Sequence, residues 1–164
     1  SAELAELAVL EQRPKEALVL VEETWKLLGG WAPVMTGIYR IERDLALVLA
    51  AIPEAGGKRD EAKGRITARI EILRKNLDST EEMLQLPFLA ESLHGLGAEE
   101  HAQAAWKSAA ELCAENQNPE TQSIGLTRIW MSYARANTWP DKETEALLLK
   151  TEKQLPEAYS KVNF

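Results

Sequence analysis

Two histidines and one cysteine carry the most reactive side chains of this chain. His94 and His101 lie seven residues apart across an expected turn, with Glu99 and Glu100 between them. A zinc site needs three or four converging ligands, and neither an HExxH pattern nor a cysteine and histidine set is present. Cys113 lies in an apolar stretch, without a histidine placed to activate it, and is expected to be a small buried hydrophobe. The sequence predicts no metal site and no cysteine nucleophile.

Acidic pairs and glycine doublets are the other residues that could do chemistry. Neighbours such as Glu81 and Glu82 point about 100° apart on a helix, so they cannot converge as an acid and base pair. The glycine doublets at 29–30 and 56–57 lack the strand-to-helix context and the Lys-Ser/Thr of a phosphate-binding loop. Because no set of residues converges on a reaction, we expect a protein that is not an enzyme and that binds no cofactor.

Composition and charge narrow the classes of partner. The chain has 164 residues, 45% of them hydrophobic and 27% charged, and no apolar run approaches the ~20 residues of a membrane span. The net charge of −7 is spread over short glutamate-rich patches, and no basic cluster for phosphate groups is visible, so neither a membrane nor nucleic acid is an expected partner. One cysteine and no signal-peptide pattern favour a cytoplasmic location.

The elements that position these residues are all expected to be helices. Strong helix formers fill almost every window, and strand-like alternation is missing. Turn signals at 13–14, 29–30, 56–57, 76–79, 95–97, 116–119 and 139–141 divide the chain into about eight helices within one domain, 1–164. Ser79 with Glu82 predicts a capping box, and Asn118 before Pro119 predicts an N-cap followed by proline at the first helical position.

A repeated pair of alanines runs through the predicted helices. The two members of each pair lie twelve residues apart on either side of a helix break. The four pairs are Ala5 and Ala17, Ala50 and Ala62, Ala90 and Ala102, and Ala134 and Ala146. Two antiparallel helices approach closely only where small side chains face each other near their turn. The pairs therefore predict four close contacts between consecutive helices.

One stretch of the chain resembles a tetratricopeptide repeat at several positions. The matching large, small and turn positions are Leu89, Ala90, Leu93, Gly97, Ala102, Trp106 and Ala109. The other units match at fewer positions, the closing proline is missing, and the period is longer than the standard ~34 residues. The resemblance implies an all-α, right-handed α-solenoid of antiparallel helix pairs, in units of approximately 1–30, 31–77, 78–117 and 118–164. A plain helical bundle is the alternative.

The resemblance also implies a concave binding face lined by the first helix of each pair. Its register assigns to that face Leu47, Ala51, Leu84, Pro87, Glu91, Arg128, Met131 and Arg135, with Asp44 one turn before Leu47. The carboxylate clamp of some family members is not recognisable. Arg128 and Arg135, seven residues apart on one helix face, are candidates to bind an acidic or C-terminal group. The alternative is that these arginines pair with Glu91 or with nothing.

Tryptophans and the last apolar stripe give further expectations. Trp25, Trp106 and Trp130 occupy helical positions expected to be core, whereas Trp31 and Trp139 lie beside breaks and are either exposed contacts or staples on helix ends. A stripe of helical spacing predicts a terminal helix that caps the array. Its members are Leu148, Leu155, Tyr159 and Val162.

The function predicted from these features is a protein-interaction scaffold that binds a peptide or protein partner on the concave face. The alternative is a regulatory or oligomerisation module of a larger signalling or transcription-regulating protein, with possible self-association. Few residues precede Leu4 to complete a first helix, which favours a chain cut from a longer protein.

Overall fold

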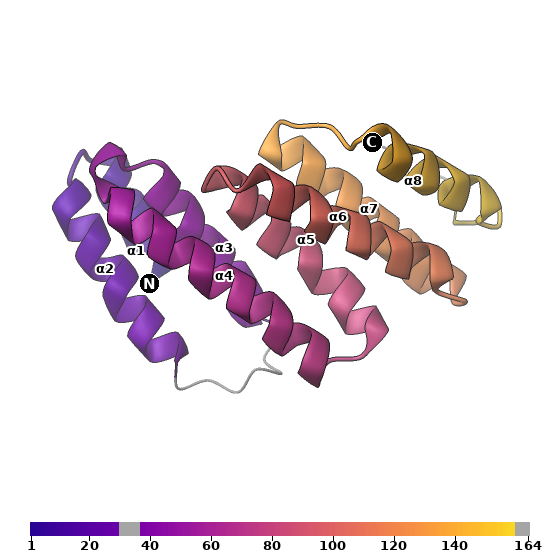
Figure 1. The fold of residues 1–164 in the computed structure, drawn as a ribbon, viewed down its shortest axis with the longest axis horizontal. Helices are drawn as coiled ribbons and strands as arrows, with labels where there is room; N and C mark the ends of the chain where they lie inside the picture. The colour runs from indigo at the N-terminus through magenta and orange to yellow at the C-terminus, as the bar shows by residue number, and fades with distance from the viewer. Residues whose placement is uncertain (30–36, 160–164) are drawn as a thin grey trace.

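A computed structural model describes residues 1–29 and 37–159. Within these ranges all regular secondary structure is helical, which confirms the predicted all-α class and its eight helices (Figure 1). They are α1 (Ala2–Leu10), α2 (Pro14–Leu28), α3 (Gly37–Ala50), α4 (Gly56–Asn76), α5 (Ser79–Gly95), α6 (Glu99–Glu115), α7 (Pro119–Ala136) and α8 (Lys142–Gln154), with a 3-10 turn at Pro53–Ala55. None of the described helices combines the length and the apolar character needed to cross a membrane.

Helix starts follow local side-chain chemistry. Asn118 caps α7 as predicted, because its side chain accepts hydrogen bonds from the backbone N–H groups of Glu120 and Thr121 at 3.0 and 3.2 Å. The predicted capping box at Ser79 is wrong. Asp78 is the N-cap of α5, since its carboxylate accepts from the first free N–H groups of the helix. The N-cap of α5 therefore lies one residue before the predicted one, and Ser79 is the first residue of the helix.

The break between α3 and α4 also differs from the prediction. The glycines at 56–57 lie in the first turn of α4, and α3 already ends at Ala50. Pro53 cannot continue a helix, and it holds Ile52 in the extended conformation. The guanidinium of Arg59 donates to the carbonyls of Leu49, Ala50 and Ile52 at 2.6 to 3.0 Å. The carbonyls of Leu49 and Ile52 also accept backbone N–H groups, so Arg59 adds to their hydrogen bonding and supplies a donor to the Ala50 carbonyl at the end of α3.

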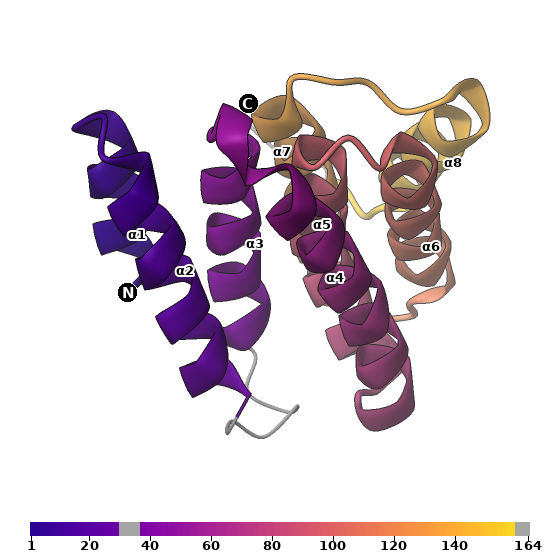
Figure 2. The ribbon, with the colours of Figure 1, turned by 60° about the vertical axis from the view of Figure 1, so that its left-hand side comes forward.

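Helix packing produces two layers. Each odd-numbered helix packs against the next one, so that α1, α3, α5 and α7 form a continuous row (Figure 2). The even-numbered helices lie behind this row, where each of α2, α4 and α6 contacts its own pair member and the next odd helix. Side-chain contacts also connect neighbouring even-numbered helices. For example, the guanidinium carbon of Arg65 in α4 lies 4.7 Å from the ring centroid of Trp25 in α2.

The core is built around the predicted alanines in three of the four pairs. Their fully buried members are Ala5, Ala17, Ala62, Ala90 and Ala102, and Ala50 is partly buried. In the fourth pair the prediction is wrong, because Ala134 and Ala146 are both exposed. The buried residues of α8 are Thr144, Leu148 and Thr151, and α8 uses them to pack mainly against α6 and only weakly against α7.

The predicted terminal stripe is only partly helical. Leu148 and Leu155 are buried, but α8 ends at Gln154 and Tyr159 is 40% exposed beyond it. Pro156 restricts Leu155 to an extended conformation, so the helix cannot continue through it. Val162 lies outside the described residues.

Candidate binding face on α5 and α7

Six of the eight predicted face residues lie together along α5 and α7. Leu84, Pro87 and Glu91 come from α5, and Arg128, Met131 and Arg135 come from α7. They share one side of the α5 and α7 contact, which we call the α5–α7 face. The heptad spacing within each set places its members on one side of the helix.

Leu47 and Ala51 lie elsewhere, although they belong to the same row of helices. Both are exposed and line a hollow of about 220 Å³ between α1 and α3, together with Val9 and Leu10. Asp44 lines the same hollow. The predicted face is therefore divided into two regions, and only the one on α5 and α7 carries arginines.

A buried carboxylate organises the α5–α7 face. Glu91 is 3% exposed, and its carboxylate accepts three hydrogen bonds from Arg135 at 2.6 to 3.2 Å. Arg43 of α3 approaches the same carboxylate at 3.5 Å and also donates to Asp44 at 2.6 and 2.9 Å. A carboxylate out of water is tolerated where charged donors surround it, so Glu91 holds α3, α5 and α7 together.

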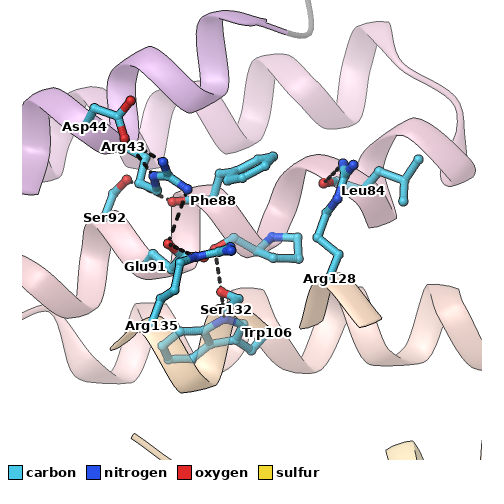
Figure 3. A network of polar contacts seen from close by, with 11 residues as sticks. Arg43, Asp44, Leu84, Phe88, Glu91, Ser92, Trp106, Arg128, Ser132 and Arg135 are labelled. Atoms are coloured by element: carbon cyan, nitrogen blue, oxygen red, sulfur yellow. Dashed lines mark hydrogen bonds and ion pairs between the residues drawn. The ribbon is translucent and has the colours of Figure 1, made fainter. Parts of the chain in front are cut away.

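Pro87 interrupts the hydrogen-bond ladder inside α5, and side chains of α7 donate to two carbonyl groups close to this interruption. Proline lacks an N–H, so the carbonyl of Met83, four residues earlier, loses its usual helical donor. Arg128 donates to the carbonyl of Leu84 at 2.9 Å, and Ser132 donates to the carbonyl of Pro87 at 2.9 Å (Figure 3). Pro87 and Glu91 are buried for the same reason: α7 packs directly over them.

An aromatic ring lies between two of the arginines. The guanidinium carbons of Arg43 and Arg128 are 5.1 and 5.4 Å from the ring centroid of Phe88. Figure 3 shows the two guanidinium groups on opposite sides of the ring. Such contacts favour a cation over an aromatic face, so Phe88 helps to keep both side chains in place.

Arg128 differs from its neighbours because its charge has no carboxylate partner within ion-pair distance among residues 1–29 and 37–159. Burial is the main cause that lowers the pKa of Arg128, and the charge of Arg135 adds to it, while Glu81 acts in the opposite direction. The side chain borders a hollow of about 350 Å³, lined by Phe88, Ser123, Ile124, Thr127, Arg128, Met131 and Arg135. This hollow combines apolar walls with a cation that lacks a counter-ion.

The reactive residues lie away from this face. Cys113 is fully buried in α6, its thiol lies 3.3 Å from the carbonyl of Gln122, and burial raises the pKa of the thiol to about 12. His94 contacts the carboxylate of Glu99 through Nδ1. Over the described ranges, no group of three or more histidine, cysteine or acidic side chains is placed to hold a metal ion. The α5–α7 face itself contains charged, apolar and hydroxyl groups suited to binding.

Three residues of the face were missed from the sequence. Phe88 follows Leu84 by four positions and precedes Glu91 by three, so helical spacing alone was a signal that could have found it. No comparable sequence pattern indicated Arg43 and Ser132, because their roles in the face come from contacts with residues more than 40 positions away.

Comparisons with known proteins add no relative. No protein-family model, no curated protein and no solved structure matches this chain. The resemblance to tetratricopeptide repeats therefore stays a prediction, as does the right-handed solenoid. Function has to be argued from the geometry of the site.

Proposed function

We propose that the chain is a protein-interaction scaffold whose α5–α7 face binds a partner segment that carries a carboxylate next to an apolar side chain. The observation that supports this most directly is Arg128, a partly buried cation without a carboxylate partner among the described residues, at the edge of a hollow. An incoming side-chain or C-terminal carboxylate would supply the missing charge. Hydrogen bonds to charged groups contribute about 1.5–3 kcal/mol each.

The walls of the hollow favour an apolar neighbour to that carboxylate. Ile124 and Met131 are 47% and 49% exposed on α7, one on each side of Arg128, and Phe88 forms the floor on α5. Covering them with a partner side chain removes apolar area from water at about 25 cal/mol per Å². Methionine adapts to differently shaped side chains, which suits recognition of a segment rather than one rigid ligand.

The framework of the face is preorganised. The Arg135 and Glu91 pair and the hydrogen bond from Arg128 to Leu84 fix both guanidinium groups before any ligand arrives. Fixing these side chains in advance lowers the entropic cost of binding. A solenoid groove of the tetratricopeptide type would present such a face along its concave side, in agreement with the register expected from the sequence.

The test measures binding of fluorescein-labelled peptides that end in Leu-Asp, Leu-Glu or an apolar residue with a free C-terminal carboxylate, by fluorescence anisotropy. Arg128→Ala is expected to weaken the dissociation constant about tenfold or more, since one charged hydrogen bond is lost. Arg40→Ala is the matched control, because Arg40 is an exposed arginine on α3 outside this face. Circular dichroism confirms that each variant is folded.

Two results contradict the proposal. One is that no peptide of the set binds with a dissociation constant below about 1 mM. The other is that the Arg128→Ala and Arg40→Ala variants both bind the peptides as tightly as the unaltered protein does. Amidating the peptide C-terminus separates a C-terminal carboxylate from an acidic side chain as the recognised group.

The alternative, an oligomerisation module, is favoured by one separate observation. Leu4, Leu7 and Leu10 of α1 are 53%, 45% and 74% exposed, a concentration of apolar side chains on one short helix. Sedimentation velocity over a range of concentrations tests it. Self-association that Leu7→Gln abolishes supports the alternative, whereas a monomer at every concentration rejects it.

A further inference from the structure

A second groove lies between α7 and α8, on a different side of α7 from the face described above. It encloses about 770 Å³, and its walls come from the last turns of α7, the connection to α8 and the middle of α8. The residues that define its character are Trp130, Trp139, Leu149, Glu145 and Glu152. We call it the α7–α8 groove.

The groove exists because α8 does not pair with α7 as the alanine pattern predicted. Asn137 ends α7 in the left-handed conformation, with φ of 52°, and the connection then arches over to α8 beside α6 (Figure 2). The buried stripe of α8 faces α6, so the adjacent side of α8, which carries Glu145, Leu149 and Glu152, has no described helix packed between it and the exposed Ala134. The space that a close helix pair would fill stays open.

Tryptophans form the apolar wall of the groove. Trp130 was predicted to be core, and this is confirmed only in part: it packs against the core but is only partly buried, and its ring lies 5.6 Å from that of Trp139 between centroids. Trp139 is 63% exposed, and Leu149 across the groove is 41% exposed. The exposure of Trp139 and its packing on Trp130 leave open whether it is a contact for a partner or a staple on the end of α7, and Trp31 lies outside the described residues. Exposed tryptophan in a concave apolar site is typical of binding hot spots.

Two carboxylates line the side of the groove formed by α8. Glu145 and Glu152 are seven residues apart, which places them on one side of the helix about 10 Å apart, with Leu149 between them. Neither makes an ion pair with any residue in the described part of the chain, whereas Glu143 on the same helix pairs with Lys107 at 2.7 Å. The two unpaired charges make the groove complementary to a cationic ligand.

We propose that the α7–α8 groove binds a basic amphipathic helix of a partner protein. Such a helix would carry lysine or arginine at two positions seven residues apart, matching Glu145 and Glu152, and an apolar side chain between them that enters against Trp130 and Trp139. An apolar helix face laid into a groove is a common mode of peptide recognition. A cation near exposed indole rings gains a further contribution from their negative faces.

The dimensions fit this occupant better than an isolated ammonium group. A volume of about 770 Å³ lies within the range of pockets that enclose large ligands, and it exceeds the size of one lysine side chain. Two carboxylates about 10 Å apart are matched by two positive charges with the same spacing. Lysines seven residues apart on a partner helix have this spacing, because that helix has the same rise per residue as α8. The proposal stands independently of the function assigned to the α5–α7 face, because the two sites use different sides of α7.

The test uses fluorescein-labelled synthetic helical peptides with two lysines seven residues apart and leucine, phenylalanine or tryptophan between them, measured by fluorescence anisotropy. The double variant Glu145→Gln and Glu152→Gln is expected to weaken binding at least tenfold and to reduce its dependence on salt. Trp139→Ala is expected to weaken binding about tenfold through lost apolar contact. Because Trp139 is largely exposed, this variant should keep its fold.

The matched control removes the same number of negative charges outside the groove. Glu23→Gln with Glu111→Gln removes two exposed carboxylates of α2 and α6 and is expected to leave the dissociation constant within about twofold. Arg128→Ala is a second control, and binding of the basic peptides that survives this change separates the α7–α8 groove from the α5–α7 face. Circular dichroism establishes that all variants are helical.

Three results would overturn the proposal. The first is that no lysine peptide of the set binds with a dissociation constant below about 1 mM. The second is equal binding when glutamate replaces both lysines of the peptide, or when both groove carboxylates are replaced. The third is that benzyltrimethylammonium binds as tightly as the peptides and displaces them completely, which would make the groove a site for small organic cations.

Discussion

A single hydroxyl group connects three elements of this protein. Ser132 of α7 is fully buried, accepts the indole N–H of Trp106 at 2.7 Å and donates to the carbonyl of Pro87 at 2.9 Å. Trp106 also stacks on Tyr133 at 4.3 Å between ring centroids. Polar groups inside a core need such partners, because an unsatisfied donor or acceptor out of water is costly.

Replacing Ser132 by alanine is expected to lower the free energy of unfolding by about 1–3 kcal/mol, because the indole N–H and the Pro87 carbonyl both lose a partner. Urea unfolding monitored by circular dichroism measures the change. Ser108→Ala is the control, since the hydroxyl of Ser108 lies near the surface at 3.5 Å from Arg74. A loss for Ser132→Ala no larger than that of the control would disprove the assigned role.

The pKa of Cys113 predicts its reactivity. Burial raises the pKa to about 12, so the folded protein carries almost no thiolate between pH 7 and 9, whereas a free cysteine with a pKa of ~8.5 carries much more. Reaction with a disulfide reagent such as dithionitrobenzoate is therefore expected to be slow for the folded chain and fast in urea. Rapid reaction at pH 8 without denaturant would contradict the burial of this thiol.

At the scale of the helix, caps and interruptions set where each element begins and bends. Asp78 begins α5 through two hydrogen bonds of 2.9 Å, and Pro87 then interrupts the same helix where α7 supplies side-chain donors. The two donors, Arg128 and Ser132, lie on α7 within one turn of Met131. The interruption of hydrogen bonding at Pro87 and the α5–α7 face therefore lie in the same part of α5.

Asp78→Ala is expected to destabilise the protein by about 1 kcal/mol, the usual effect of losing an N-cap. Ser79→Ala is expected to change stability by less than about 0.5 kcal/mol, since Ser79 is exposed and does not cap the helix. Thermal and urea unfolding of both variants decide between the two residues. The reverse order of effects would restore the capping box that the sequence alone suggested.

At the scale of the whole molecule, packing is concentrated on one helix pair. α5 packs against α3, α4, α6 and α7, whereas the main contacts of α1 with other described helices are those with α2 and α3. The two sides of α7 also differ in charge: Arg128 on the α5–α7 face and Glu145 and Glu152 in the α7–α8 groove have no ion-pair partner among residues 1–29 and 37–159.

Native-state hydrogen exchange is expected to show this uneven packing. Amides of α5 and α6 should exchange slowest, because they open only with global unfolding, whereas amides of α1 and α8, at the two ends of the array, should exchange faster. Mass spectrometry of peptic fragments measures the order. Uniform protection of all eight helices would show instead that the array unfolds as one cooperative unit.

The amino-acid sequence determined the helical class, the number of helices and most of their ends. These features depend on local chemistry, such as proline at 119 and the capping side chain of Asn118, and local signals are readable without knowing the fold. Helical spacing is also a local property, so the sequence could place the residues of the α5–α7 face on one side of each of their helices. The burial of the alanines in three of the four pairs could be predicted for the same reason.

Only the tertiary structure decided which partners these residues meet. Arg128 reaches the Leu84 carbonyl and Ser132 reaches Pro87, across 44 and 45 positions of sequence. The structure also decided between the alternatives left open for Arg135, because this arginine pairs with Glu91. The turn of α8 toward α6, which opens a groove where the fourth alanine pair predicted contact, is likewise a result of packing. Spacing along a helix shows which side a residue is on, but the neighbour that covers that side depends on how the helices pack against one another.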